Sequence, residues 1–437
     1  MSNRQDDRVD DQGSLNSVFE PDASALAAAV IRAVTPPPAS LSAVMDSTGV
    51  VDLPVHLPAN GIGPQGALDL LAGSALPTTG LLRDWDSSAR MDSPTPWITW
   101  AGSAWVASRS VNLLDYESSR SAVELHDRVM QWLAPLWGMK SGHIVPGSTI
   151  ANLSAIWVAR DAVGISRIVA SEACHESLAK VSRVLAMPLV TLPVDGEEML
   201  DTDALVDFAR RDPDGMGRTV VVLTAGTHAA GAIDPLADAP KRLRRLGLNP
   251  PWWHVDASWA GPLALSRRGK DLLRGVDSAD SVSVAAHKMM FTPTETSFVL
   301  FKDPQKADRV LEFTGPSGTS QLGLMGSRSD RALPLAMLLL AYGSEGLAGW
   351  IEQEMEAIGR VGEALFARDD VKVFAAPRSG VLLWRPLTRD VVDVAARLGA
   401  QRGRTVYAAG HRWIRNVAAN PLMDSAALLA AIDEALA

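Results

Sequence analysis

Short apolar runs rich in β-branched residues alternate with longer amphipathic stretches through the middle of the chain. The apolar runs predict strands at RIVAS (167–171), LVTLPV (189–194), TVVVLTAG (219–226), WWHVDA (252–257), SVSVAA (281–286) and SFVLFKD (297–303). The stretches between them have helical periodicity, as in ANLSAIWVARDAVG, HESLAKVSRVLAM, DTDALVDFARRD and DAPKRLRRLG. Strands separated by helices in this way are typical of an α/β fold with a mainly parallel sheet.

The two ends of the chain have other patterns. The first residues are polar and acidic, and the helical stretch DASALAAAVIRAV ends at the Pro-rich VTPPPASL (34–41). Beyond the sheet region, a long helical stretch leads to VKVFAA, GVLLWRPL and two helices around HRWIRNVA, an α+β pattern. We therefore expect a flexible leader at 1–20, an N-terminal segment at 21–118, a large domain at 119–345 and a smaller α+β C-terminal domain at 346–437.

Composition and charge favour a globular protein that binds small molecules. Of the 437 residues, 47% are apolar and 21% are charged, which is enough apolar sequence for a large core. The net charge is −9, from 50 acidic against 41 basic residues. Because no Lys/Arg stripe interleaved with aromatic residues is present, we expect no nucleic-acid partner.

The compartment expected from the sequence is the cytoplasm. The start of the chain lacks the basic and apolar regions of a secretory signal. The apolar run LPLAMLLLAYG (333–343) is shorter than the roughly 20 residues of a membrane span, so we interpret it as a buried helix and expect no membrane partner. The single cysteine, Cys174, excludes an internal disulfide framework and a multi-cysteine metal site, and we expect no metal.

Two residues at predicted strand ends carry candidate chemistry, because ligands of parallel sheets bind at the carboxyl ends of the strands. Lys288 follows SVSVAAH, where a partly desolvated amine becomes a nucleophile toward a carbonyl; a solvated surface lysine is the alternative. Asp256 ends WWHVDA, where it could cap the next helix or hold the protonated ring nitrogen of pyridoxal phosphate.

Two further features complete the pattern. Gly147, Ser148 and Thr149 stand just before a predicted helix, where backbone N–H groups and hydroxyls can cradle a phosphate or simply cap the helix. His175 follows the strand RIVAS, where it could stack on a pyridine ring or be purely structural. These four features together indicate a site for pyridoxal phosphate. In sequence order they are a phosphate cradle, a histidine that can stack on the ring, an aspartate that can hold the ring nitrogen, and a lysine.

In these motifs the chain resembles the pyridoxal-phosphate-dependent group II amino-acid decarboxylases, which belong to fold type I in the aspartate aminotransferase superfamily. The resemblance runs from about residue 110 to 330 and weakly to the end. It is carried by LDYESSRSAVELHDRVMQWLAPLWG, GSTIANLSAIWVARD, ASEACHESLAKV, TAGTHAAGAIDPL, HVDASWAG and ADSVSVAAHKMM. It implies a homodimer with active sites at the interface, in which the N-terminal segment contributes to dimerisation and to the substrate entrance.

The resemblance also implies a role for each motif residue. Lys288 would form the Schiff base with the cofactor, Asp256 would pair with the ring nitrogen, and His175 would stack on the ring. The implied cofactor-binding set is Gly147, Ser148, Thr149, His175, Thr227, Asp256, Ala257, His287 and Lys288. His287 would contact the phosphate, and Thr227 and Ala257 would line the ring.

Three departures from the family pattern bear on the reaction. His228 stands where relatives commonly have a second threonine, and Ala285 stands where several have an asparagine. The region that matches the family's mobile loop, DRVLEFTGPSGTSQLGLMGSRSD, contains no tyrosine to reprotonate the substrate carbanion. The tyrosines of the chain are Tyr116, Tyr342 and Tyr407.

The resemblance implies a lyase that acts on an L-amino acid or a conjugate of one through an external aldimine, most simply by α-decarboxylation. Without the loop tyrosine, decarboxylation coupled to oxidative deamination, or β-elimination from a cysteine conjugate (C–S lyase) in specialised metabolism, are alternatives. A non-catalytic, partner-binding homologue is a third hypothesis, which the intact Lys288, Asp256 and His175 argue against.

The substrate is not identified by the sequence. Arg328, Arg412 and Arg415 are candidates for binding a substrate carboxylate, with His228 as a further substrate-contacting candidate; surface or interface ion pairing is the alternative for the arginines. The Trp-rich WITWAGSAW (97–105) would suit either a bulky substrate at the entrance or packing at a dimer interface.

Overall fold

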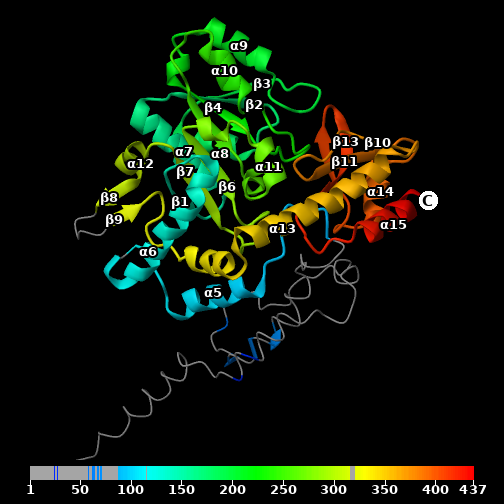
Figure 1. Ribbon diagram of the computed structural model, residues 1–437, viewed down its shortest axis with the longest axis horizontal. Coiled ribbons are helices and arrows are strands. Elements are labelled where there is room, and N and C mark those ends of the chain that lie inside the picture. The colour runs from blue at the N-terminus through cyan, green and yellow to red at the C-terminus, as the bar shows by residue number, and fades with distance from the viewer. Residues whose placement is uncertain are drawn as a thin grey trace, which may run out of the picture. The chain divides into compact units, whose positions relative to one another are not determined.

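A seven-stranded sheet forms the centre of the computed structural model (Figure 1), which describes residues 87–114, 116–314 and 320–437 and a few isolated positions before residue 87. The strands are β1 (Ser141–Val145), β2 (Arg167–Ser171), β3 (Leu189–Leu192), β4 (Thr219–Thr224), β5 (Trp252–Asp256), β6 (Ser281–Ala285) and β7 (Ser297–Phe301). Their order is β1-β7-β6-β5-β4-β2-β3. The predicted leader, the Pro-rich break and most of the N-terminal segment before residue 87 lie outside the described residues.

The sheet is mainly parallel, as predicted. Strands β3, β2, β4, β5 and β6 pair in parallel, while β7 runs antiparallel to both β6 and β1. The segment 286–296 between β6 and β7 is too short for the crossover that a parallel pair needs, so the chain turns back on itself.

All six strands predicted for this sheet are present, and one strand of the sheet was missed. The strand predicted at 189–194 ends at Leu192, before Pro193, because proline has no N–H to continue the ladder. The missed strand is β1, whose sequence SGHIV has a glycine and only two β-branched residues and does not stand out as an apolar run.

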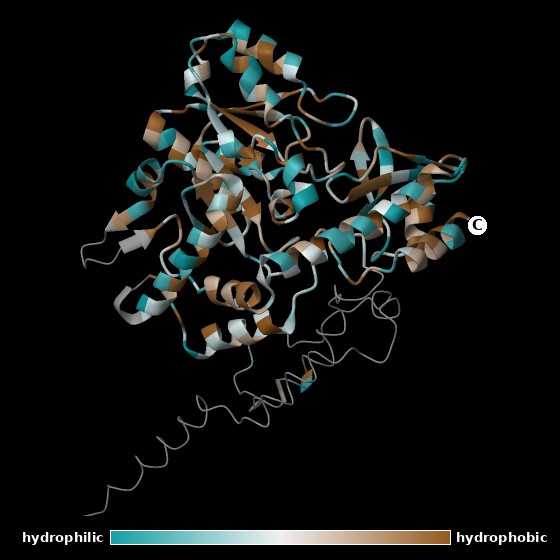
Figure 2. Cartoon of the chain, in the orientation of Figure 1, coloured by the Kyte–Doolittle hydropathy of each residue, from teal (hydrophilic) through white to brown (hydrophobic). Residues whose placement is uncertain are grey.

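Apolar residues of the strands alternate between two cores. Val169 and Val221 belong to a core on one face of the sheet, and Ile168, Val220 and Val222 belong to the core on the other face. This alternation follows from the two-residue repeat of a strand. Figure 2 shows the central strands mostly in the apolar colour, with polar residues on the surrounding helices.

The predicted helices pack around the sheet. Before β4 these elements are α6 (Tyr116–Leu133), η2 (Ala134–Trp137), α7 (Ser148–Val163), α8 (Ser177–Leu185), α9 (Thr202–Arg211) and η3 (Met216–Arg218). After β4 they are α10 (Asp238–Arg244), η4 (Gly261–Leu265), α11 (Arg267–Leu272), η5 (Val276–Ser278) and α12 (Pro304–Leu311), followed by the small hairpin β8 (Glu312–Thr314) and β9 (Ser320–Leu322). Helix α7 starts directly at the GST motif, so its N-terminus lies at the carboxyl ends of the parallel strands.

The C-terminal part has the predicted α+β composition. A four-stranded antiparallel sheet, in the order β10-β11-β13-β12, consists of β10 (Val371–Val373), β11 (Val381–Pro386), β12 (Arg404–Ala408) and β13 (His411–Val417). The two predicted helices are α14 (Val391–Leu398) and α15 (Ser425–Leu436), which flank HRWIRNVA in the sequence. That motif itself is strand β13, which was not predicted.

Helix α13 (Ala332–Phe366) connects the two parts and bends at Gly343, whose φ of 65° is open to glycine at little cost. Its length and composition would allow it to cross a membrane, but its residues Leu335 and Ile351 pack in the core of the large sheet and Ile358 packs in the C-terminal core. The helix is therefore a core helix. The predicted boundary at 345/346 falls within it and stays a prediction.

The Trp-rich stretch forms helix α5 (Trp97–Ser108), which packs on α13. Gly102 lies against the backbone of Pro334, so the two helices approach closely there. Trp97 and Trp105 point outward, with 64% and 54% of their surface exposed. Their predicted place at an entrance or a dimer interface stays a prediction.

Candidate active site

A pocket lies where β4, β5 and β6 end. It is lined by Met91, Ser148, His175, Thr224, Gly226, His228, Asp256, Ser258, Trp259 and Lys288. Five of the predicted site residues therefore share one pocket, although they lie up to 140 positions apart in the sequence, from Ser148 to Lys288. The residues converge because each lies at or after the end of a strand, and the carboxyl ends of parallel strands meet at one edge of the sheet.

Lys288 lies in the turn that follows β6, and its side chain is partly buried. Desolvation lowers the pKa of its amine below the ordinary value, while the nearby carboxylates of Asp256 and Asp92 act in the opposite direction. A larger fraction of the amine is therefore neutral near pH 7 than for an exposed lysine, and only the neutral amine is a nucleophile.

Asp256 is the last residue of β5 and is only 4% exposed. One carboxylate oxygen accepts a hydrogen bond from Asn152 Nδ2 (2.8 Å), and the other accepts from the backbone N–H of Ser258 (3.1 Å), the Ser258 hydroxyl and the Ser283 hydroxyl (3.3 Å). Burial acts to raise the pKa of Asp256, but the hydrogen bonds from Ser258 and Asn152 lower it below the ordinary value. The pocket thus contains an ionised carboxylate.

The GST motif opens helix α7. Gly147 has a φ of 92° at the N-cap position, a left-handed conformation that favours glycine, while Ser148 and Thr149 are the first two helical residues. The Ser148 hydroxyl lies 3.4 Å from the Ser297 hydroxyl, which lies 3.5 Å from His287 Nδ1. The structure therefore brings the predicted phosphate ligands of two separate motifs together around Ser297.

Two histidines face each other across the pocket. The rings of His175 and His228 are 6.1 Å apart, edge to face. His175 Nδ1 accepts a hydrogen bond from the backbone N–H of Ser177 (3.1 Å), so the neutral ring carries its proton on Nε2. Desolvation lowers the pKa of His175, and desolvation together with the charge of Arg415 lowers the pKa of His228 to about 4. Both rings are therefore largely neutral near pH 7.

Thr227 and Ala257 are buried beside the pocket. The Thr227 hydroxyl oxygen accepts a hydrogen bond from the backbone N–H of Ala232 (3.0 Å), and the N–H of Ala257 donates to the carbonyl of Ser283 (2.9 Å). Both residues fix the backbone at strand ends next to Gly226 and Asp256.

The three predicted arginines are not equivalent. Arg415 is 1% exposed and lies behind His228, where its Nη1 donates to the His228 carbonyl (2.6 Å) and is 3.2 Å from His228 Nε2. Arg412 is exposed, with its Nε 3.0 Å from the Tyr407 hydroxyl. Arg328 lines a separate hollow together with His126 and His143. Only Arg415 contacts a residue of the candidate site.

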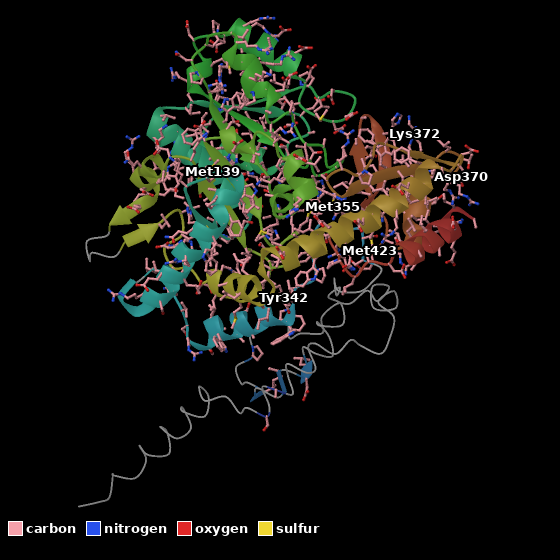
Figure 3. All side chains as sticks on the ribbon, in the orientation of Figure 1. Met139, Tyr342, Met355, Asp370, Lys372 and Met423 are labelled. Carbon is pink, nitrogen blue, oxygen red and sulfur yellow. The ribbon has the colours of Figure 1, made fainter. Side chains whose placement is uncertain are left out.

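The described tyrosine side chains lie away from this pocket. Tyr342 is on α13 (Figure 3), and its ring centroid lies 4.8 Å from that of Trp350, while Tyr407 is exposed on β12. Residues 315–319 of the loop region lie outside the described residues. Within the described part of the chain, no group of three or more His, Cys, Asp or Glu side chains is arranged to hold a metal ion.

Sequence reasoning missed several residues of the site, chiefly Asn152, Ser258, Ser283 and Ser297. Two signals could have found them. Asn152 lies four positions after Ser148, on the same face of the helix. Ser283 alternates with apolar residues on a buried strand, where a hydroxyl needs a hydrogen-bond partner.

A family model described as the pyridoxal-dependent decarboxylase conserved domain matches residues 82–385. The chain belongs to this family. The chain is 28% identical over 350 residues to the aspartate 1-decarboxylase of Aliivibrio fischeri, covering 69% of this chain and 63% of that protein. It is 26% identical over 360 residues to the L-2,4-diaminobutyrate decarboxylase of Rhizobium meliloti, covering 77% and 72%. The match thus spans less than two thirds of the aspartate decarboxylase's length.

Solved structures with the same fold include Oryza sativa TDC with PLP and tryptamine (TM-score 0.79, 18% identity, 99% of both chains covered). Catharanthus roseus tryptophan decarboxylase in complex with L-tryptophan is also similar (TM-score 0.77, 17% identity, 100% of this chain and 99% of that chain). At these identities the likeness concerns the fold, which confirms the fold class predicted from the sequence.

The cofactor of this family is pyridoxal phosphate, and the residues of the pocket fit it. An amine with a lowered pKa can react with the aldehyde, and an ionised carboxylate suits a protonated ring nitrogen. The N-terminus of α7, with the Ser148 and Thr149 hydroxyls, has the N–H groups and the dipole that favour a phosphate.

Proposed function

We propose that this decarboxylase removes the α-carboxylate of an L-amino acid. The observation that carries the proposal is the placement of Lys288 and Asp256 in one pocket, with an amine of lowered pKa and a carboxylate of lowered pKa. Bound pyridoxal phosphate supplies the electron sink that accepts the electron pair left by the departing carboxylate.

The chain's own residues hold and orient the cofactor in this proposal. Lys288 attaches it, Asp256 keeps the proton on its ring nitrogen, and His175 packs against its ring. The proposed phosphate ligands are Gly147, Ser148, Thr149 and His287. Ser297 lies between Ser148 and His287, within hydrogen-bond distance of both. Thr227 and Ala257 line the ring.

His228 is the proposed contact to the substrate. Because the Arg415 guanidinium can only donate, His228 Nε2 accepts, and the proton of the neutral ring is on Nδ1. That N–H is suited to donate to a carboxylate oxygen. Arg415 then acts by orienting His228, while Arg328 and Arg412 are less suited as substrate ligands because neither contacts the pocket residues.

The family match and the decarboxylase relatives support decarboxylation over the alternatives. Oxidative deamination and β-elimination remain the competing predictions because the tyrosine expected in the loop is absent from the sequence. The homodimer, the cytoplasmic location and a role in specialised metabolism stay predictions from the sequence and its resemblance.

The first test is cofactor attachment. Purified protein reconstituted with pyridoxal phosphate should show a visible absorbance band that survives gel filtration. The band should be lost in Lys288→Ala and kept in Lys270→Ala, which changes an exposed lysine on α11. A wild-type protein that stays colourless would contradict the proposed attachment.

The second test separates the reactions. A panel of L-amino acids and cysteine conjugates is incubated with the enzyme, and CO2, amine, H2O2, aldehyde, thiol and ammonia are each assayed. We expect CO2 and amine in equal amounts. CO2 with H2O2 and aldehyde would replace the proposal with oxidative deamination, and thiol without CO2 would replace it with β-elimination.

A further inference from the structure

Behind Asp256 lies a buried row of polar side chains that the proposed function has not used. It consists of Trp252, Ser281, His254 and Asn152, contributed by strands β5 and β6 and helix α7. We infer that this row is a one-directional hydrogen-bond relay that ends on Asp256, and that Asn152 and His254 are positioning residues for it. The inference rests on the proposed role of Asp256 toward the cofactor ring.

The relay begins at a tryptophan. The Trp252 indole N–H can only donate, and it lies 2.9 Å from the Ser281 hydroxyl oxygen. The Ser281 proton is then free to point at His254 Nδ1, which is also 2.9 Å away. His254 Nδ1 accepts this proton when the neutral ring carries its own proton on Nε2, which is the tautomer that the other end of the relay requires.

The direction is fixed at the other end by the carboxylate. Ionised Asp256 can only accept, so the Asn152 group 2.8 Å from its oxygen must be the amide NH2. The Asn152 carbonyl oxygen then accepts from His254 Nε2 at 3.1 Å. The Ser283 hydroxyl lies 2.6 Å from the same carbonyl oxygen and 3.3 Å from Asp256, so its single proton is shared between these two acceptors. Flipping the amide would oppose two oxygens at Asp256, so the carboxylate sets the orientation of Asn152 and, through it, the tautomer of His254.

The surroundings strengthen such a relay. Asn152, His254 and Ser281 are 0% exposed, so water does not compete for their hydrogen bonds. In a buried chain each donor polarises the next, and here every donor points toward Asp256. Desolvation lowers the pKa of His254 to about 4, which keeps the single-proton form that the relay requires at neutral pH. The relay thereby stabilises the ionised form of Asp256.

The tautomer of His254 tests the relay without any cofactor. In wild-type apoprotein labelled with ¹⁵N-histidine, long-range ¹H–¹⁵N spectra should show His254 as the Nε2–H tautomer, with the signal assigned by its loss in His254→Gln. An Nδ1–H or protonated His254 at pH 7 would overturn the inference.

The second test breaks the relay by substitution. Asn152→Leu and His254→Leu should weaken pyridoxal phosphate binding and lower kcat by about 10- to 100-fold, the range seen when residues that orient a ligand-binding group are lost. His254→Gln should stay within about threefold of wild type, because its amide N–H can replace Nε2–H toward Asn152.

Ser154→Ala is the matched control. Ser154 lies on the same helix as Asn152 and is equally buried, but its hydroxyl has no hydrogen-bond partner among the described residues. Folded Asn152→Leu and His254→Leu proteins with the cofactor affinity of Ser154→Ala would overturn the relay. If Asp256→Asn is also harmless, the proposed role of Asp256 fails; if only Asp256→Asn is damaging, the relay alone fails.

Discussion

Two buried carboxyl groups of this protein have pKa values shifted in opposite directions, and the difference lies in their neighbours. Asp256, at the end of β5, accepts hydrogen bonds from Asn152, Ser258 and Ser283, and its pKa is lowered. Glu354, in the middle of α13, is 0% exposed, and neither of its carboxyl oxygens has a hydrogen-bond partner among the described residues. Desolvation raises its pKa well above the ordinary value, which favours the neutral acid.

Asp234 falls between these two cases. It is 1% exposed and accepts backbone N–H groups from Leu200 and Thr224, each at 2.7 Å. Desolvation still raises the pKa of Asp234 to about 7. Two backbone donors thus do not keep a buried carboxylate fully ionised here, whereas the side-chain donors added around Asp256 do. Burial of an acidic side chain therefore does not by itself indicate function. The hydrogen-bond donors around the carboxyl group are the better indicator.

The largest expected effect comes from removing the charge of Asp256. Asp256→Asn keeps the shape of the side chain but leaves a neutral amide in place of the carboxylate. We expect kcat to fall on the order of 10³-fold, as when a preorganised electrostatic contact is lost. Steady-state decarboxylation kinetics with saturating pyridoxal phosphate measures this.

Glu354→Gln is the control for Asp256→Asn, because it makes the same carboxyl-to-amide change at an equally buried position. Since burial favours the neutral form of Glu354 and this residue lies outside the pocket, we expect the kcat of Glu354→Gln to stay within about twofold of wild type. Equal effects of the two substitutions would show that burial, and not the donor set, distinguishes the two sites.

A smaller effect concerns the pH dependence of stability. The folded pKa of Glu354 lies above the unfolded value of 4.5, so its contribution to stability is present below pH 4.5 and is lost as pH rises through the folded pKa. Between pH 4.5 and 7, the free energy of unfolding of wild type should therefore fall relative to Glu354→Gln. The limiting slope for one proton is about 1.4 kcal/mol per pH unit.

Asp256 should show the opposite sign. Its folded pKa lies below the unfolded value of 3.8, so its contribution is present above pH 3.8 and is lost as pH falls below that value. Urea unfolding of wild type, Glu354→Gln and Asp256→Asn across the pH range measures both differences. Parallel curves for all three proteins would mean that neither pKa is shifted.

The sequence predicted the elements that have a clear local pattern of apolar and polar residues. Six strands, the helices between them and the convergence of Asp256 and Lys288 at one edge all follow from apolar runs and from the polar residues after them. The sequence analysis missed β1, β12 and β13, because none has a distinct apolar run. Strand β1 forms by pairing with β7, about 150 residues later, whereas β12 and β13 form a hairpin across the two-residue turn at 409–410.

The same limit applies to the site. The donors around Asp256 come from α7, from the loop after β5 and from β6. These segments are far apart in the sequence and are brought together only by folding. Likewise, nothing in the local sequence indicates that Arg415 lies behind His228 while Arg412, three residues earlier, points to Tyr407 at the surface. Local sequence patterns thus identify the groups proposed to react. The residues that orient these groups and shift their pKa values can be recognised only in the folded chain.

The smallest effect is expected from removing the Glu354 carboxyl altogether. Glu354→Met has a similar length and no polar atom, so it removes the cost of burying an unpaired carboxyl between the apolar neighbours of α13. An unpaired buried polar group costs about 1–3 kcal/mol, and the free energy of unfolding should rise by up to that amount at pH 7. Urea unfolding at pH 7 measures the gain, with Glu354→Gln as the variant that keeps the polar group. A less stable Glu354→Met protein would show that Glu354 has a hydrogen-bond partner in the native molecule. Glu354 and Asp256 would then differ only in the number of donors around them.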